Sequence, residues 1–235
     1  MSPIHRTAPR TILTVVALLT AAVLAACATR TGPTPGGAAP TVRPQPGVST
    51  TSDTARSLIM IIRHGEKPDG SSPGVDPTGK RDDKSLTAVG WNRAHHLVDL
   101  LAPTQGPPRR GLAKPTAIYA AGANDNGEGE RTRETVQPLA HELGITVNTD
   151  FGKGEEKALV KTVTARPGTT LIAWQHGEIP ALVAAFPSVT PTPPAQWPAD
   201  RFDVVWTLTK TADGWHFAQL PELLLPQDQA GVIGG

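Results

Sequence analysis

The chain has 235 residues and a mass of 24.6 kDa, which is enough for one domain of ordinary size with additional segments. Its 22 basic and 21 acidic residues leave a net charge of +1, so no excess of charge draws it to nucleic acid or to anionic lipid. The single cysteine excludes an internal disulfide framework and a zinc site built from several thiolates, and we expect neither a metal nor a cofactor.

The N-terminal residues have the pattern of a secretory signal peptide. The basic residues Arg6 and Arg10 precede an apolar run over residues 11–26, which is shorter than the about 20 residues that a membrane-spanning helix needs. A positively charged start, an apolar centre and small residues at the end are typical of an export signal. The sequence therefore predicts a signal peptide over residues 1–26.

The only cysteine of the chain stands directly after this apolar run. Leu24-Ala25-Ala26-Cys27 resembles the lipobox of bacterial lipoproteins. The resemblance implies cleavage before Cys27, lipidation of its thiol, and a lipid anchor on the outer face of a bacterial membrane as the only membrane contact. More than one acyl chain gives stable anchoring. The alternative is an N-terminal membrane anchor with an incidental cysteine.

Residues 27–54 comprise the cysteine of the expected lipid anchor and, after it, a segment rich in Pro, Gly and Thr. Gly and Pro supply 23 and 24 residues of the chain, and many of them lie in this segment. With almost no large apolar side chains it cannot bury enough surface to fold, so we expect a disordered tether. The folded domain is then 55–235.

The first half of this domain alternates between strand and helix patterns. Residues 58–62 (LIMII) form a continuous apolar run that is typical of a strand buried on both faces. Residues 87–101 carry apolar side chains at helical spacing. A short strand is expected at 117–120, and a helix at 131–143 that ends at Gly144.

The second half continues the same alternation. We expect a short strand at 145–147, a helix at 155–165, a buried strand at 170–174 and a helix at 179–186. The Asp-Gly turn signal at 213–214 predicts a hairpin of 204–208 with 215–220. Such alternation indicates an α/β domain with a mostly parallel central sheet flanked by helices.

Two strands end in similar polar segments. The first leads into Arg63-His64-Gly65-Glu66, and the strand at 170–174 leads into Gln175-His176-Gly177-Glu178. Open α/β sheets bind ligands at the carboxyl ends of their strands. A lone histidine after a strand is more often structural, but two in matching contexts predict a shared site.

Four segments together resemble the histidine phosphatase superfamily, which includes phosphoglycerate-mutase-like and acid-phosphatase-like enzymes. Residues 58–66 (LIMIIRHGE) are similar to the signature of that family. Residues 86–94 (LTAVGWNRA) are similar to its Leu-Thr-x-x-Gly-x-x-x-Ala helix start, and residues 131–135 match its Arg-x-x-x-Thr. Residues 174–176 match its late strand and second histidine. The order of the four agrees, and the resemblance implies a three-layer, phosphoglycerate-mutase-like sandwich.

The resemblance implies a role for each matching residue. His64 is the nucleophile that forms a phosphohistidine, and the Gly65 carbonyl holds its other ring nitrogen. Arg63, Arg131 and His176 bind the phosphate, which suits planar arginine donors. Arg133 is the competitor for Arg131, but the spacing to the threonine favours Arg131.

The proton donor for the leaving group is open at this stage. Glu178, two places after His176, is similar to the acid of one phytase-like branch. A mutase-like branch instead uses a glutamate where Glu155 and Glu156 lie. The third option is none of these glutamates, and it includes Asp76, Asp82 and Asp83. Glu66 is expected either at the rim of the site or behind the residues that contact the substrate.

These residues predict a phosphomonoester hydrolase that takes a small phosphorylated substrate through a phosphohistidine on His64. Phosphoryl transfer needs a nucleophile in line with the leaving oxygen and positive donors around the other oxygens. The loops 67–84 and 122–130 are expected to border the pocket. The alternative is a surface lipoprotein that binds a phosphorylated ligand and does little chemistry. Export disfavours a mutase of central metabolism, and the oligomeric state is left open.

Overall fold

The computed structural model describes residues 57–124 and 127–234. The signal peptide, Cys27 and the tether predicted for 27–54 lie outside the described residues. Within the described part, no helix is both long enough and apolar enough to cross a membrane.

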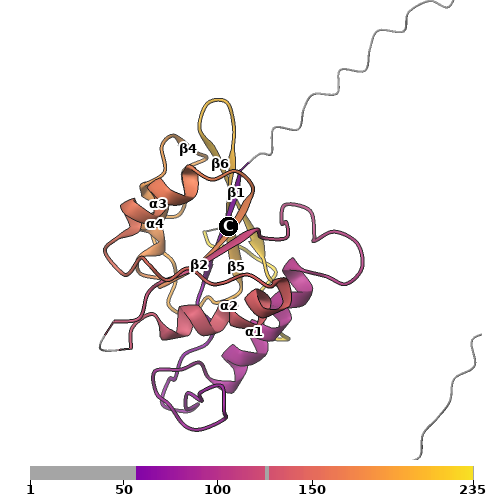
Figure 1. Cartoon of the computed structure of the whole chain (residues 1–235), viewed down its shortest axis with the longest axis vertical. Coiled ribbons are helices and arrows are strands. Elements are labelled where there is room, and N and C mark those ends of the chain that lie inside the picture. Colours follow the sequence, from indigo (N-terminus) through magenta and orange to yellow (C-terminus); the bar gives the residue numbers. More distant parts are fainter. Residues whose placement is uncertain (1–56, 125–126, 235) are drawn as a thin grey trace, which may run out of the picture. The chain divides into compact units, whose positions relative to one another are not determined.

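The described residues are built around one six-stranded sheet with the order β2-β3-β1-β5-β6-β4 (Figure 1). Its strands are β1 (Leu58–Arg63), β2 (Ala117–Ala120), β3 (Thr169–Trp174), β4 (Val189–Thr190), β5 (Val204–Lys210) and β6 (Trp215–Pro221). Strand β1 pairs in parallel with β3, which pairs in parallel with β2, whereas β5 runs antiparallel to both β1 and β6. The hairpin β5–β6 confirms the prediction from the Asp-Gly turn.

Helices cover both faces of the sheet and make a three-layer α/β sandwich, as the sequence predicted. The helices are α1 (Ala88–Leu101), α2 (Glu130–Leu143), α3 (Glu156–Thr164) and α4 (Ile179–Ala184). On β1, Met60 and Ile62 belong to the core with residues of α1 and α2, whereas Ile59 and Ile61 belong to the core with residues of α3 and α4. All four side chains are fully buried. Burial on both faces explains why the run LIMII shows no alternation.

Two short elements differ from the sequence expectation. The predicted strand at 145–147 is wrong, because only Asn148 forms an isolated bridge, with Tyr119 of β2. Ile145 and Val147 pack against the core on the α1–α2 side, so their apolar character comes from packing rather than from a strand. Strand β4 was not expected, because two residues are too short for a periodic signal.

Candidate functional site

The carboxyl ends of β1 and β3 bring the two predicted histidines to one cavity. Arg63 is opposite Trp174 in the parallel register, and the His64 N–H donates to the Trp174 carbonyl at 3.2 Å. His64 and His176 both line a cavity of about 150 Å³. The other lining residues are Lys67, Glu128, Gly129, Arg131, Thr132, Lys153 and Gln175. The loops 67–84 and 122–130 therefore border this cavity, as predicted.

The ring of His64 is fixed in one tautomer. Its Nδ1 lies 2.7 Å from the carbonyl oxygen of Gly65. A carbonyl only accepts hydrogen bonds, so Nδ1 carries the proton and Nε2 keeps its lone pair in the neutral ring. This arrangement leaves a nucleophilic nitrogen available at the cavity.

The protein also keeps this imidazole neutral. Burial lowers the pKa of His64 from its ordinary 6.5 to about 3, and the positive charge of Arg63 acts in the same direction. Only 5% of the residue is exposed. A neutral ring at physiological pH is the form that can attack phosphorus.

This pKa shift predicts that acid destabilises the fold through His64. Between pH 6.5 and about 3, the unfolded chain binds a proton at His64 that the folded chain does not. The free energy of unfolding therefore falls as pH falls, by about 1.4 kcal/mol per pH unit for one such group. In the variant His64→Asn, urea unfolding should show a pH slope that is shallower by that amount. The same change at the exposed His216 should leave the slope as it is, and an unchanged slope in His64→Asn would contradict the buried neutral ring.

The loop after β1 lies directly on the start of α1. The Gly65 N–H donates to the Thr135 hydroxyl of α2 at 2.8 Å, and the Glu66 carbonyl accepts from the Thr87 N–H at 2.9 Å. A Cβ at Gly90 would lie 2.6 Å from the Glu66 carbonyl oxygen and 2.9 Å from its nitrogen. The Gly90 of the helix-start motif is thus required for close contact between α1 and the loop that carries His64.

Arg63 lies behind the cavity rather than among its lining residues. Its Nη1 donates to the carbonyls of Ala199 at 2.6 Å and Arg201 at 3.0 Å, and its guanidinium carbon is 3.7 Å from the centre of the Phe202 ring. Burial lowers its pKa to about 10, so it stays charged. Its Nε and Nη2 are buried and have no hydrogen-bond partner among the described residues. Unmet donors of this kind are costly, and an anion would satisfy them.

The first turn of α2 forms another side of the cavity. Gly129, Arg131 and Thr132 line it, and the N-terminal end of a helix favours anions. Gly129 has a φ of 101°, and a Cβ there would lie 2.3 Å from the Gly122 carbonyl oxygen. Arg133 points elsewhere, because it contacts Glu130 and Gln137. Of the two arginines, Arg131 is the one that lies at the cavity.

Lys67 adds positive charge to the cavity, and His176 adds an imidazole that can donate a hydrogen bond. Burial lowers the pKa of His176, and the charges of Arg63 and Lys67 lower it further. With Arg131 and Lys153, the cavity presents several donors that can carry positive charge. Such a surface matches an anionic group of small size.

The predicted acid Glu178 lies beside this cavity. It precedes α4, and one carboxylate oxygen lies 3.1 Å from Nζ of Lys153, which does line the cavity. The negative charge of Glu178 raises the pKa of His176, against the effect of burial.

The other proposed acids are less well placed. The buried Glu156 accepts hydrogen bonds from Trp174 Nε1 at 3.1 Å and from the Gly154 N–H, so it has a structural role. Glu155 accepts from the Gly152 N–H at 2.7 Å and lines a neighbouring cavity. The aspartates Asp76, Asp82 and Asp83 accept hydrogen bonds within their own loop and are absent from the lining. Glu66 is not among the lining residues and pairs with Arg93 at 2.8 Å, so of its two expected positions it takes the one behind the site.

Sequence reasoning gave an individual role to only three of the nine lining residues, and three of the others line a second cavity as well. Glu128 and Lys153 come from loops and Gln175 precedes His176, and none of them was given a role. All three also line the neighbouring cavity of about 290 Å³. The only available signals were the acidic loop 122–130 and the glutamine at the end of β3.

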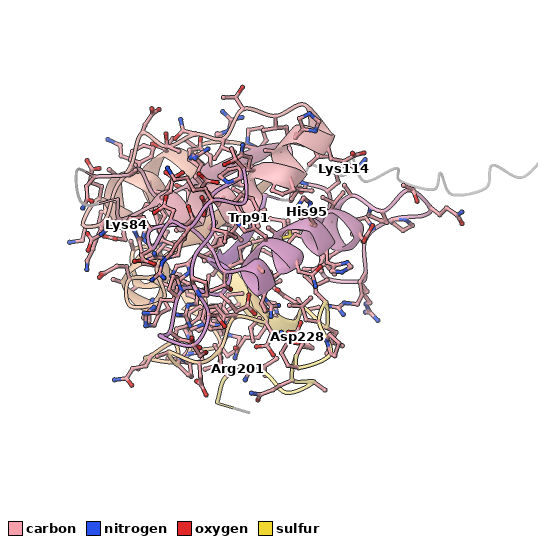
Figure 2. All side chains as sticks on the ribbon, turned by 90° about the horizontal axis from the view of Figure 1, so that it is seen from below. Lys84, Trp91, His95, Lys114, Arg201 and Asp228 are labelled. Atoms are coloured by element: carbon pink, nitrogen blue, oxygen red, sulfur yellow. The ribbon has the colours of Figure 1, made fainter. Side chains whose placement is uncertain are left out.

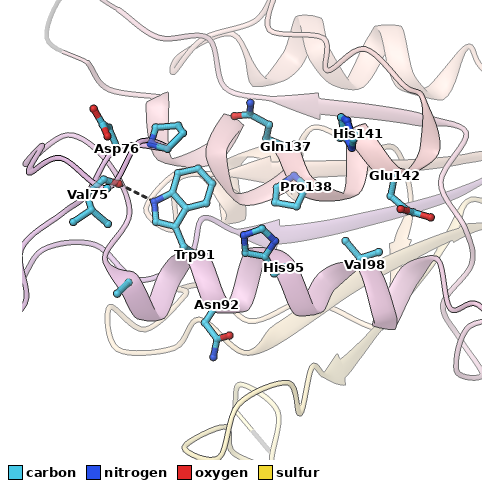
Figure 3. A pocket seen from close by; sticks show the side chains of 13 residues that line it. Val75, Asp76, Trp91, Asn92, His95, Val98, Gln137, Pro138, His141 and Glu142 are labelled. Atoms are coloured by element: carbon cyan, nitrogen blue, oxygen red, sulfur yellow. Dashed lines mark hydrogen bonds between the residues drawn. The ribbon is translucent and has the colours of Figure 1, made fainter. Parts of the chain in front are cut away.

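A larger hollow of about 830 Å³ lies between α1 and α2, away from these residues. Figure 3 shows Trp91 and His95 on α1 facing Gln137 and Pro138 on α2, with Trp91 bonded to Val75. It shares no residue with the cavity of His64. Of these two cavities, only the smaller one is lined by the two histidines predicted from the sequence. Among the described residues, no group of three or more His, Cys, Asp or Glu side chains could hold a metal ion.

Comparison with known proteins gave matches among solved structures alone. No family model and no curated protein matches the chain. A mycobacterial glucosyl-3-phosphoglycerate phosphatase matches with a TM-score of 0.43 and 15% identity, over 70% of this chain and 97% of the other. A protein of Agrobacterium tumefaciens assigned as the phosphohistidine phosphatase SixA matches with a TM-score of 0.41 and 15% identity, over 68% and 94%. One of Escherichia coli assigned as an α-ribazole-5'-phosphate phosphatase matches with a TM-score of 0.44 and 14% identity, over 70% and 96%.

Proposed function

We propose that this protein hydrolyses phosphomonoesters through a phosphohistidine on His64. The observation that carries the proposal is the neutral His64 ring, whose Nδ1–H is held by Gly65 and whose Nε2 is free in a cavity lined by Arg131, His176 and Lys67. A nucleophile surrounded by cationic side chains and other hydrogen-bond donors is the arrangement that phosphoryl transfer requires.

The donors have separate tasks in this proposal. Arg131 binds phosphate oxygens from the start of α2, and His176 donates from the end of β3. The unmet Nε and Nη2 of Arg63 approach the same anion from behind His64. Together they stabilise the charge that the phosphoryl oxygens carry during transfer.

Glu178 is the proposed acid. Its carboxylate lies 3.1 Å from Nζ of Lys153, which lines the cavity of His64. As His64 Nε2 bonds to phosphorus, the ester bond breaks and Glu178 gives its proton to the leaving oxygen. The Glu178 carboxylate then takes a proton from the water that splits the phosphohistidine into free His64 and phosphate.

The cavities favour a small, polar substrate. The cavity of His64 holds about 150 Å³, enough for a phosphoryl group. The neighbouring cavity, which shares Glu128, Lys153 and Gln175, is lined by polar and small side chains. The leaving group of the ester would occupy it.

Turnover and trapping by the purified full chain test the proposal. It should hydrolyse nitrophenyl phosphate and, when quenched during turnover, carry an acid-labile, base-stable phosphoryl group on His64. Tight binding of inorganic phosphate without turnover would instead support the alternative of a ligand-binding lipoprotein, which the ion pair of Glu178 with Lys153 favours. Neither binding nor turnover would overturn both.

Lipid anchoring is a second proposal, and it rests on Cys27 alone. The variant Cys27→Ser should lose acyl labelling, because the hydroxyl does not accept the lipid through a thioether. In a bacterial host it should appear as an unprocessed or released protein. Palmitate labelling followed by membrane fractionation measures this, with Ser49→Ala in the predicted tether as the control. Full labelling of the Cys27→Ser variant would contradict a lipid anchor.

A further inference from the structure

A buried cluster of charges lies next to the loop that carries His64, outside the cavity itself. Arg93 of α1 is 2% exposed and contacts three carboxylates, on Glu66, Glu222 and Asp228. Glu222 and Asp228 come from the C-terminal segment after β6. Figure 2 labels Asp228 on this yellow segment, beneath α1.

Each nitrogen of the Arg93 guanidinium is used. Its Nε lies 3.2 Å from both oxygens of Glu66, and Nη2 lies 2.8 Å from Oε1 of Glu66. Nη2 also donates to Asp228 at 2.7 Å, and Nη1 donates to Glu222 at 2.8 Å and to Asp228 at 3.1 Å. A planar fork is needed to hold three carboxylates in this way, and a lysine ammonium cannot replace it.

The C-terminal segment is itself fixed around these contacts. The second oxygen of Asp228 accepts from the N–H groups of Leu224 at 2.8 Å and Leu225 at 3.1 Å. The N–H of Glu222 donates to the Asp203 carbonyl at 2.7 Å. The segment 222–228 therefore presents its two carboxylates to Arg93 in a defined geometry.

We call Arg93, Glu222 and Asp228 the clamp, because together they hold the side chain of Glu66 in place. Burial raises the pKa of Glu222 to about 8, although the charge of Arg93 acts in the opposite direction. Burial works against ionisation of Asp228, but the hydrogen bonds from Arg93 hold its pKa below the ordinary value. The contacts of Arg93 with Asp228 at 2.7 Å and with Glu66 at 2.8 Å therefore join the C-terminal segment to the loop of His64.

Glu66 is also connected to the ring of His64. Its peptide is packed against Gly90 and bonded to Thr87, and the preceding Gly65 carbonyl accepts the proton of His64 Nδ1. A shift of Glu66 would move this carbonyl and release the ring from its single tautomer. No member of the Arg93 cluster lines the cavity of His64.

We propose that Arg93 is a positioning residue for the imidazole of His64, and that the C-terminal segment 222–228 holds Arg93 in that role. This inference rests on the proposed function for its effect on turnover. A remote segment that lends no side chain to the cavity thereby controls the nucleophile.

The experiment compares variants that break the clamp with a control variant that only lowers the stability of the fold. Arg93→Lys keeps the charge but removes the fork, and Asp228→Asn is the milder second variant if the first does not fold. Leu97→Ala is the matched control, because Leu97 is a fully buried core residue one turn further along α1. For each folded variant, ¹⁵N NMR of the His64 ring gives the tautomer, and nitrophenyl phosphate turnover gives kcat and KM.

Asp228→Asn and any folded Arg93→Lys should populate both tautomers of His64 and lower kcat by ~10-fold or more, the effect that losing a supporting residue usually has. KM should change less, because Arg131 and His176 are untouched. Leu97→Ala should keep the single Nδ1–H tautomer and the kcat of the unaltered protein. A single tautomer in the clamp variants, or a mixed tautomer in Leu97→Ala, would overturn the proposal. The tautomer is measured without substrate, so this result stands even if the protein proves to have no phosphatase activity.

Discussion

The variant His64→Ala is expected to lose phosphatase turnover by ~10⁴-fold or more, because the covalent route through the phosphohistidine disappears. Among the described residues, no other imidazole at the cavity can substitute for it in the same line of attack, since His176 follows the neighbouring strand β3 and is proposed to bind the phosphate. The assay is steady-state hydrolysis of nitrophenyl phosphate, together with trapping of the phosphoryl-protein in acid and base.

The control for this variant is His95→Ala. His95 is exposed on α1 and lines the large hollow, so its loss should leave both kcat and the trapped phosphoryl group unchanged. Circular dichroism and urea unfolding verify that both variants are folded. If His64→Ala retained turnover within about tenfold of the unaltered protein, His64 would not be the nucleophile.

The second large effect is expected from Glu178→Gln, and it should depend on the leaving group. Glutamine keeps the size of the side chain but has no proton to give. An alkyl phosphate, whose leaving oxygen is a strong base, should be hydrolysed ~10²- to 10⁴-fold more slowly. The rate of nitrophenyl phosphate hydrolysis should fall only a few-fold, because this leaving group departs without a proton. The ratio of the two kcat/KM values measures the effect.

Two matched variants separate acid catalysis from damage to the cavity. Lys153→Met breaks the same ion pair from the other side but keeps the Glu178 carboxyl, so it should slow both substrates by a similar factor. Glu128→Gln removes the other carboxyl at the cavity and should also affect both alike. A leaving-group dependence that appears in Glu128→Gln rather than Glu178→Gln would assign the acid to Glu128.

The parts of the site that could be predicted from the sequence are those attached to regular elements. His64 and His176 follow buried strands, and Arg131 opens a helix, so each lies at the end of an element with a strong pattern. Parallel pairing of β1 with β3 then brings them together. The close approach of α1 was also signalled, because Gly90 stands in the motif at the start of that helix.

The remaining parts depend on contacts that no local pattern indicates. Lys153 and Glu128 come from loops, where neither a period nor a cap fixes the direction of a side chain. The cluster of Arg93 with Glu222 and Asp228 joins residues more than 100 positions apart. The predicted strand at 145–147 was wrong because its apolar residues pack on the core without forming a ladder.

The place of β1 in the sheet has a consequence for the order of folding. It is the first strand of the domain along the chain, but it lies between β3 and β5, and Leu58 pairs with both Thr169 and Thr209. Closing such long loops costs conformational entropy before any contact forms, so pairing of this strand is intrinsically slow. A chain that emerges from the ribosome N-terminus first cannot complete the strand that carries His64 until residue 209 is available. His64, the proposed nucleophile, is therefore among the first residues of the domain to be synthesised and among the last to reach its final position.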